Sequence, residues 1–254
     1  MTKYLNIPEG SNMIEIVNLV KDFDSNRVLD SVNLKVKKGE TLAVIGPSGC
    51  GKSTLLKLII GLFPPTDGKI YVAGKEITSL SPEKAGELRK HIGMIFQSGA
   101  LFDSLTVAEN VGFGLREHTK LKEKKISQIV SQKLNMVGLA GTENLMPIEL
   151  SGGMQKRVSL ARALATDPEI IFYDEPTTGL DPIMANSIEE LIIDLHKKLE
   201  VTAIVVTHML STVYRISDRI TMLHKGKIIE AGNPEETQKS QNPIIKKFIT
   251  GGAD

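Results

Sequence analysis

The sequence predicts an α/β fold with a mostly parallel sheet, on three observations. Short apolar runs, such as residues 42–45 and 170–174, have the length of buried strands, and helix-like segments follow them. Apolar and polar residues alternate over residues 13–20 and 28–36, which indicates strands of an antiparallel part. Strand signals are absent from residues 98–153, where helical patterns predict an insertion. Alternation of strands and helices favours a parallel sheet that binds ligands at the carboxyl ends of its strands.

Composition narrows the class of protein. The 254 residues suffice for one large domain or two small ones, and 41% hydrophobic with 24% charged residues is typical of a globular chain. The net charge of +1, without a dense basic stripe, argues against a nucleic-acid partner. A single cysteine, Cys50, excludes an internal disulfide and fits a reducing compartment. Residues 1–8 lack the apolar core of a signal peptide, and no apolar run has the length of a bilayer span, so we expect any membrane role to depend on a partner.

In the first half, the antiparallel segments come first, and Phe23 is expected in the turn between them. The strand at residues 42–45 leads through a glycine-rich loop into a helix at residues 55–60, which ends at Gly61 before Pro64. A strand, a helix and a short buried strand are then expected at residues 68–73, from Pro82 onward and at residues 92–96, with Gln97 at the end of the last.

The insertion is predicted to be helical. Thr106 and Glu109 form a capping-box pattern that opens one helix, and residues 120–136 predict a second helix, which Gly138 ends. Ser151 is placed to cap the next helix. After the insertion, strands are expected at residues 170–174, 201–206, 219–223 and 227–230, and helices from Asp181 to near Leu199, over residues 208–216 and from Asn233.

Residues 46–54 form the glycine-rich loop between strand and helix. Its spacing, Gly-x-x-x-x-Gly-Lys-Ser, predicts that backbone N–H groups and the following helix start bind phosphate oxygens. Lys52 is expected to reach the β- and γ-phosphates of a nucleotide, and Ser53 to ligate Mg²⁺. A chance glycine turn is the alternative, but the strand and helix on either side argue against it.

Two more stretches contain residues suited to act on a bound nucleotide. Asp174 ends an apolar strand and can reach a Mg²⁺ shell, while Glu175 beside it can polarise an attacking water. A helix cap or loop residue is the ordinary explanation of one carboxylate at a strand end, but two of them downstream of a phosphate loop favour catalysis. Ser151 can cap a helix whose first N–H groups are left uncovered by Gly152 and Gly153. This pattern predicts a second anion site. The alternative is an ordinary capped helix with a flexible entry and no ligand.

Together these motifs resemble the nucleotide-binding domain of ATP-binding cassette (ABC) proteins, over residues 13–240. The order and spacing match from the phosphate loop through Gln97 and Leu150-Ser-Gly-Gly153 to Asp174-Glu175 and His208. The resemblance implies a P-loop NTPase (RecA-like) core with a mostly parallel sheet, an N-terminal antiparallel β subdomain and an inserted α-helical subdomain. The implied parts of this single domain, residues 1–254, are the core at 13–97 and 166–240, the helical signature subdomain at 98–165 and the tail at 241–254.

The resemblance implies ATP and Mg²⁺ as ligands and gives each motif a role. Glu175 is implied as the catalytic base, His208 as the switch histidine near the γ-phosphate, and Gln97 as a contact to Mg²⁺ or the attacking water. Phe23 sits where the family places an aromatic residue under adenine, with core packing as the alternative. The implied ATP contacts in the phosphate loop are Gly46, Ser48, Gly49, Cys50, Gly51, Lys52, Ser53 and Thr54, and the implied Mg²⁺ contacts are Ser53, Gln97 and Asp174.

The family also implies a second copy of the chain as a partner. Ser151, Gly152 and Gly153 match the signature motif, which contacts the γ-phosphate bound by the opposite subunit, and Asp181 matches a loop that reaches across the dimer. Each copy then supplies half of each ATP site, so ATP joins the two copies and hydrolysis releases them.

The insertion carries a closer resemblance, to the MlaF/Mkl group of lipid transport ATPases. It rests on Phe96–Phe102, Glu109–Val111, Leu115–His118 and Leu145–Pro147. The group implies a separate membrane permease, an MCE-domain lipid-binding protein, phospholipid transport between membranes of a bacterial envelope, and a place on the cytoplasmic face of the inner membrane. An importer of amino acids or metal ions and a non-transport ABC ATPase are the alternatives. Ser98–Phe102 is expected either in a groove for the permease or in the core.

Overall fold

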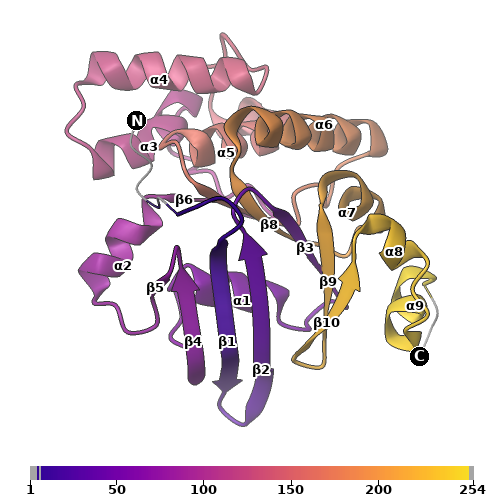
Figure 1. Cartoon of the computed structure of the whole chain (residues 1–254). Coiled ribbons are helices and arrows are strands. Elements are labelled where there is room, and N and C mark those ends of the chain that lie inside the picture. The colour runs from indigo at the N-terminus through magenta and orange to yellow at the C-terminus, as the bar shows by residue number, and fades with distance from the viewer. Residues whose placement is uncertain (1–4, 6, 252–254) are drawn as a thin grey trace. The chain divides into compact units, whose positions relative to one another are not determined.

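The computed structural model describes Leu5 and residues 7–251 (Figure 1). The chain forms two compact units: the first unit comprises Met1–Leu88 and Glu200–Asp254, and the second unit comprises Arg89–Leu199. The tail predicted at residues 241–254 extends past the described residues at its end.

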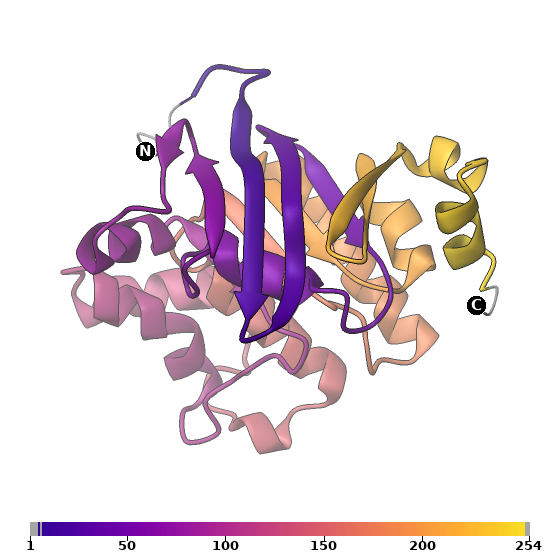
Figure 2. The same cartoon turned by 90° about the horizontal axis from the view of Figure 1, so that it is seen from below.

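An antiparallel sheet in the first unit has the order β2-β1-β4-β5. Its two long strands, β1 (Asn12–Phe23) and β2 (Asn26–Lys37), lie side by side in Figures 1 and 2. β4 (Asp67–Val72) pairs with the other edge of β1, and the short β5 (Lys75–Glu76) pairs with β4. In the second half of β2, the buried apolar residues Val32, Leu34 and Val36 alternate with exposed polar residues, so the predicted half-buried antiparallel sheet is confirmed.

A parallel set of strands follows in the first unit. β3 (Thr41–Ile45) lies between β8 (Thr202–Val206) and β9 (Arg219–His224) and is parallel to both. Every residue of β3 and β8 is buried, as expected for strands covered on both faces. β10 (Lys227–Gly232) returns antiparallel to β9 as the predicted hairpin.

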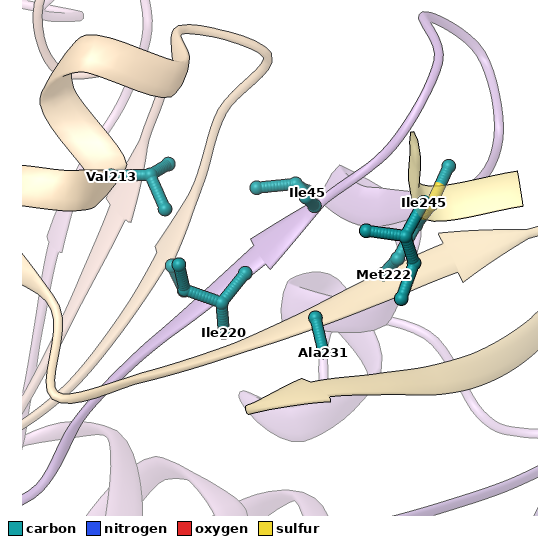
Figure 3. Close-up of a cluster of buried hydrophobic side chains, with 7 residues drawn as sticks. Ile45, Val213, Ile220, Met222, Ala231 and Ile245 are labelled. Atoms are coloured by element: carbon teal, nitrogen blue, oxygen red, sulfur yellow. The ribbon is translucent and has the colours of Figure 1, made fainter. Parts of the chain in front are cut away.

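The first unit also contains helices. They are α1 (Lys52–Ile59), α2 (Pro82–Arg89, whose last residue belongs to the second unit), α7 (Leu210–Ile216), α8 (Pro234–Gln238) and α9 (Pro243–Ile249). Figure 3 shows the cluster of buried side chains that joins α7 and α9 to the strands, with Ile45 of β3, Val213 of α7 and Ile245 of α9 among them. The last described helix is therefore packed against the core of its own unit.

The second unit contains the parallel pair β6 (Ile92–Ile95) and β7 (Ile170–Asp174) and the whole of the helical insertion predicted at residues 98–165. The helices are α3 (Val107–His118), α4 (Glu123–Met136), the short 3-10 helix η1 (Pro147–Glu149), α5 (Gly152–Leu164) and α6 (Pro182–Leu199). Thr106 and Glu109 form the predicted capping box at α3. Helix α4 begins three residues later than its sequence pattern suggests, and the side chain of its N-cap residue, Lys122, gives no cap hydrogen bond.

Two local predictions are corrected by the structure, and one short strand was not predicted. Phe23 is the last residue of β1, paired with Asn26, rather than a turn residue. His208 precedes α7, which begins at Leu210, because Met209 at the helix start is still extended. The strand β5 was missed because two residues carry no readable periodicity. In the described part of the chain, no helix combines the length and apolarity needed to cross a membrane.

Candidate functional site

The phosphate loop follows β3 and is shaped by two crowded glycines. Gly46 has φ of 149°, and a Cβ added to it would lie 2.3 Å from the backbone oxygen of Leu223. Gly51 has φ of 106°, and its Cβ would lie 2.9 Å from Cγ1 of Val28. Both positions therefore need glycine for conformation and for space. The second contact also brings the start of β2 against the loop.

Lys52 is the first residue of α1 and is 7% exposed. Its Nζ donates hydrogen bonds to the carbonyl oxygens of Gly46, at 2.8 Å, and Pro47, at 3.0 Å, so the ammonium lies across the loop. The N-cap residue, Gly51, has no side chain to bond the first N–H groups of the helix. A helix start with backbone donors and a buried lysine beside it is suited to bind phosphate.

Cys50 is half-buried inside the loop. Burial raises the pKa of its thiol, although the nearby Lys52 opposes this shift. A thiol with a raised pKa is mostly protonated at neutral pH and is a weak nucleophile. Cys50 is thus a small neutral residue of the loop rather than an activated group.

The parallel pairing of β3 with β8 brings His208 to the same sheet edge as the phosphate loop. Val44 pairs with Val206, and the N–H of Thr207 donates to the carbonyl oxygen of Val44 at 3.4 Å. His208 follows directly and is exposed. Since Gly46 lies two residues beyond Val44, the first unit brings two predicted site elements to one edge.

Phe23 is 40% exposed at the end of β1. Its ring meets the ring of Phe63 edge to face, with centroids 5.8 Å apart, and Nζ of Lys21 lies 4.8 Å from its centroid. Its strand partner Asn26 is two residues from Val28, which touches the phosphate loop. The ring thus packs on Phe63 and also has a face open to a planar ligand, and stacking on adenine stays a prediction.

The second unit places Gln97, Asp174 and Glu175 at one edge of the β6–β7 pair. Ile95 pairs with Tyr173, so the residues that follow each strand leave the sheet on the same side. Gln97 is exposed, whereas Asp174 and Glu175 are each 9% exposed. The carbonyl groups of these segments are held by one side chain that the sequence did not single out, Lys156 of α5.

Glu175 has an unusual backbone. Its φ of 51° is left-handed, a conformation that non-glycine residues rarely adopt and that occurs preferentially at functional sites. Its Oε2 accepts a hydrogen bond of 2.9 Å from the hydroxyl of Thr178. The carboxylate is therefore held in a fixed direction by a neighbour three residues on.

The signature motif opens α5 as predicted. The hydroxyl of Ser151 accepts a hydrogen bond from the N–H of Met154 at 3.3 Å. A Cβ added to Gly153 would lie 1.9 Å from the methyl carbon of Met184. Asp181 caps α6 by accepting from the N–H groups of Ile183 and Met184. The start of α5 is thus packed directly on the start of α6, and the residues predicted to reach a second copy lie together.

The comparisons with known proteins agree on one family. The family model described as ABC transporter matches residues 29–178. The chain is 46% identical over 245 residues to the intermembrane phospholipid transport system ATP-binding protein MlaF of Haemophilus influenzae, covering 96% of this chain and 93% of that protein. It is 42% identical to the probable ribonucleotide transport ATP-binding protein mkl of Mycobacterium tuberculosis, covering 94% of this chain and 66% of that protein.

A solved structure has the same fold. It is the dimeric ATP-binding cassette MJ0796 in a post-hydrolysis state bound to ADP and Pi, and it matches with a TM-score of 0.81 at 33% identity. The match covers 87% of this chain and 99% of that one. The α/β fold with an antiparallel N-terminal sheet, predicted from the sequence, is therefore confirmed.

Proposed function

Since this chain belongs to the ABC transporter family, we propose that it is the ATPase subunit of a system that moves phospholipid between membranes of a bacterial envelope. Its enzymatic activity is that of the family, ATP hydrolysis coupled to transport. The observation that carries the phospholipid assignment is the 46% identity, over almost the whole of both chains, to a protein named for intermembrane phospholipid transport.

In the proposed site, the triphosphate of ATP lies on the loop of residues 46–54, with the ammonium of Lys52 against its β- and γ-phosphates. Phe23 stacks on adenine. The hydroxyl of Ser53 and the carboxylate of Asp174 are hard oxygen donors, which suit Mg²⁺ that is otherwise held by phosphate and water. When bound, Mg²⁺ neutralises charge on the phosphate oxygens.

Hydrolysis is proposed to use Glu175 as the base. An oxygen of water forms a bond to the γ-phosphorus while the bond from that phosphorus to the oxygen of ADP breaks, and Glu175 takes the proton of the water. The hydroxyl of Thr178 keeps the carboxylate in one direction. Gln97 and His208 are proposed to contact the attacking water and the γ-phosphate.

The active form is proposed to be a homodimer with two shared ATP sites. The N-terminus of α5, with Ser151 and its two glycines, presents N–H groups that suit the γ-phosphate held by a second copy. Support comes from MJ0796, a similar cassette whose structure with ADP and Pi is dimeric. Asp181 packs beside this helix start and is proposed to reach across the same interface.

A separate membrane permease is proposed as the partner that holds the chain at the cytoplasmic face of the inner membrane, with an MCE-domain protein as a further component. The permease would dock at Ser98–Phe102. Phe102 is 43% exposed and its ring lies 4.7 Å from that of Phe113, itself 38% exposed, so the two form an apolar patch on the second unit. No role for nucleic acid is proposed.

The first prediction concerns Glu175→Gln. Because the amide cannot accept the proton, phosphate release should fall by about 100- to 10,000-fold, while ATP affinity is retained. Hydrolysis is measured by phosphate release and binding by a fluorescent ATP analogue. The matched control is Glu190→Gln on the exposed face of α6, which should keep the wild-type rate. Rapid hydrolysis by the Glu175 variant would remove this residue as the base.

The cargo is tested on the assembled complex. Affinity purification of the tagged chain from membranes should recover a permease and an MCE-domain protein, and ATP should drive labelled phospholipid between donor and acceptor vesicles. The alternative cargo is a ribonucleotide, because one relative is named for ribonucleotide transport. ATP-dependent uptake of a labelled ribonucleotide, with no movement of lipid, would overturn the phospholipid assignment.

A further inference from the structure

One side chain of α5 connects the segments that carry the proposed catalytic residues. Lys156 is 7% exposed, and its Nζ donates a hydrogen bond to the carbonyl oxygen of Gln97 and another, at 3.4 Å, to that of Glu175. The first carbonyl follows β6 and the second follows β7. A single ammonium therefore links both strand ends to the helix that begins with the signature motif.

A second cation of α5 holds the rest of the same loop. The guanidinium of Arg162 donates to the carbonyl oxygens of Ala100, at 2.6 Å, and Gly99, at 2.9 Å. The helix also runs close to this loop, since a Cβ added to Gly99 would lie 4.0 Å from Cβ of Ser159. All of these hydrogen bonds end on backbone oxygens, so they fix the path of the loop and leave the Gln97 side chain exposed.

The electrostatics favour a positioning role for Lys156. Burial lowers the pKa of its ammonium, and the negative charges of Asp174 and Glu175 oppose this shift. A buried ammonium costs free energy unless it is well hydrogen-bonded. The hydrogen bonds to the two carbonyls offset that cost only while both segments keep their present arrangement, so displacing either segment is opposed.

We propose that Lys156 is a positioning residue for ATP hydrolysis. It holds the loop of Gln97 and the backbone of Glu175 in one arrangement and connects both to the signature helix. The proposal rests on the proposed roles of Gln97 and Glu175. Since Lys156 acts through backbone carbonyls of the second unit, and ATP is proposed to bind the loop of the first, its loss should affect turnover more than ATP binding.

The test compares Lys156→Met with Lys156→Arg. Methionine keeps the length of the side chain but donates no hydrogen bond, so kcat should fall about 10- to 100-fold, as is typical when an outer supporting contact is lost. KM for ATP should change by less than about threefold, because the variant leaves unchanged the contacts that bind ATP equally in the ground state and the transition state. Arginine retains the charge and the donors, and should recover most of the rate.

The matched control is Lys133→Met. Lys133 is a buried lysine of the same unit, 5% exposed, whose Nζ donates to Oδ1 of Asp167 at 2.5 Å. Its loss removes an ion pair between this buried lysine and the exposed Asp167, away from the proposed catalytic segments. The melting temperature should therefore fall while kcat of the folded enzyme stays at the wild-type value. Rates are compared at a temperature where circular dichroism shows both variants folded.

Two results would overturn the proposal: a wild-type kcat in Lys156→Met, or an equal loss of kcat in folded Lys133→Met. Should Lys156→Met not fold, Lys156→Gln is compared in its place, since glutamine is neutral but can donate to one carbonyl, and its kcat should fall with KM unchanged. Failure of the proposed base is recognised separately, as full hydrolysis by Glu175→Gln.

Discussion

Gly46 and Gly49 belong to the same loop and both have positive φ, but their surroundings differ. A Cβ at Gly46 would meet the backbone oxygen of Leu223 at 2.3 Å, and backbone cannot move aside as a flexible side chain can. A Cβ at Gly49, where φ is 77°, would meet nothing within 4 Å. The first glycine is required by space and conformation, the second by conformation alone.

We therefore expect Gly46→Ala and Gly49→Ala to differ. Gly46→Ala combines steric overlap with backbone strain and should lower the free energy of unfolding by about 3 kcal/mol or more, with loss of ATP binding. Gly49→Ala carries only the left-handed strain and should cost about 1 kcal/mol. Urea unfolding and titration with a fluorescent ATP analogue measure the two effects. Equal destabilisation by both variants would contradict this explanation.

At the scale of single residues, some site residues can be predicted from the sequence and others cannot. Gly46, Lys52 and Ser53 were predictable because a phosphate loop is a local structure, with its chemistry written in consecutive residues. Lys156 was not, since its bond to the carbonyl of Gln97 joins residues 59 positions apart. Within α5 that lysine looks like any charged residue of an amphipathic helix.

At the scale of elements, the loop that enters α3 is fastened by one buried side chain. Asn110 is fully buried, and its Oδ1 accepts a hydrogen bond of 2.8 Å from the N–H of Phe102. Its Nδ2 donates to the carbonyl oxygens of Phe102, Leu105 and Thr106. The carbonyl oxygens of Phe102 and Thr106 also accept backbone N–H groups, so the side chain matters most for the N–H of Phe102 and the carbonyl oxygen of Leu105.

Asn110→Ala should remove the side-chain partner of the Phe102 N–H and of the Leu105 carbonyl oxygen and lower the free energy of unfolding by about 1–3 kcal/mol. The matched control is Asn135→Ala on the exposed side of α4, which should change stability by no more than about 0.5 kcal/mol. Urea unfolding followed by circular dichroism measures both. A stable Asn110 variant would show that water satisfies the turn.

The elements themselves were predictable to the extent that their ends are marked by local chemistry. The capping box at Thr106, the helix start at Asn233 and the cap at Ser151 all occur where the sequence places them. Helix α4 was predicted from residue 120 but begins at Glu123, because its first residues have helical composition without a cap. The burial of α9 through Ile245 depends on distant strands and was not predictable from the tail alone.

At the scale of the whole molecule, the proposed function needs two copies of the chain. The helix start at Ser151 is capped by its own hydroxyl, and its glycines leave N–H groups for an anion. The single cysteine of the chain, Cys50, lies in the phosphate loop to which that anion is proposed to bind. One introduced cysteine is therefore enough to ask whether the signature motif of one copy reaches the phosphate loop of another.

We expect Ser151→Cys, combined with Glu175→Gln, to form a disulfide-linked dimer through Cys50 when ATP is present and an added mild oxidant accepts the two electrons of the thiols. Because burial raises the pKa of the Cys50 thiol, oxidation should accelerate as the pH rises above neutrality, where more thiolate forms. Non-reducing electrophoresis measures the product, and Cys50→Ser should abolish it. A dimer that forms equally without ATP would contradict nucleotide-driven pairing. If the disulfide between two copies does not form in protein saturated with ATP, the result would count against the shared ATP site. It would then also count against the proposal that ATP acts on the permease by joining two copies of the chain.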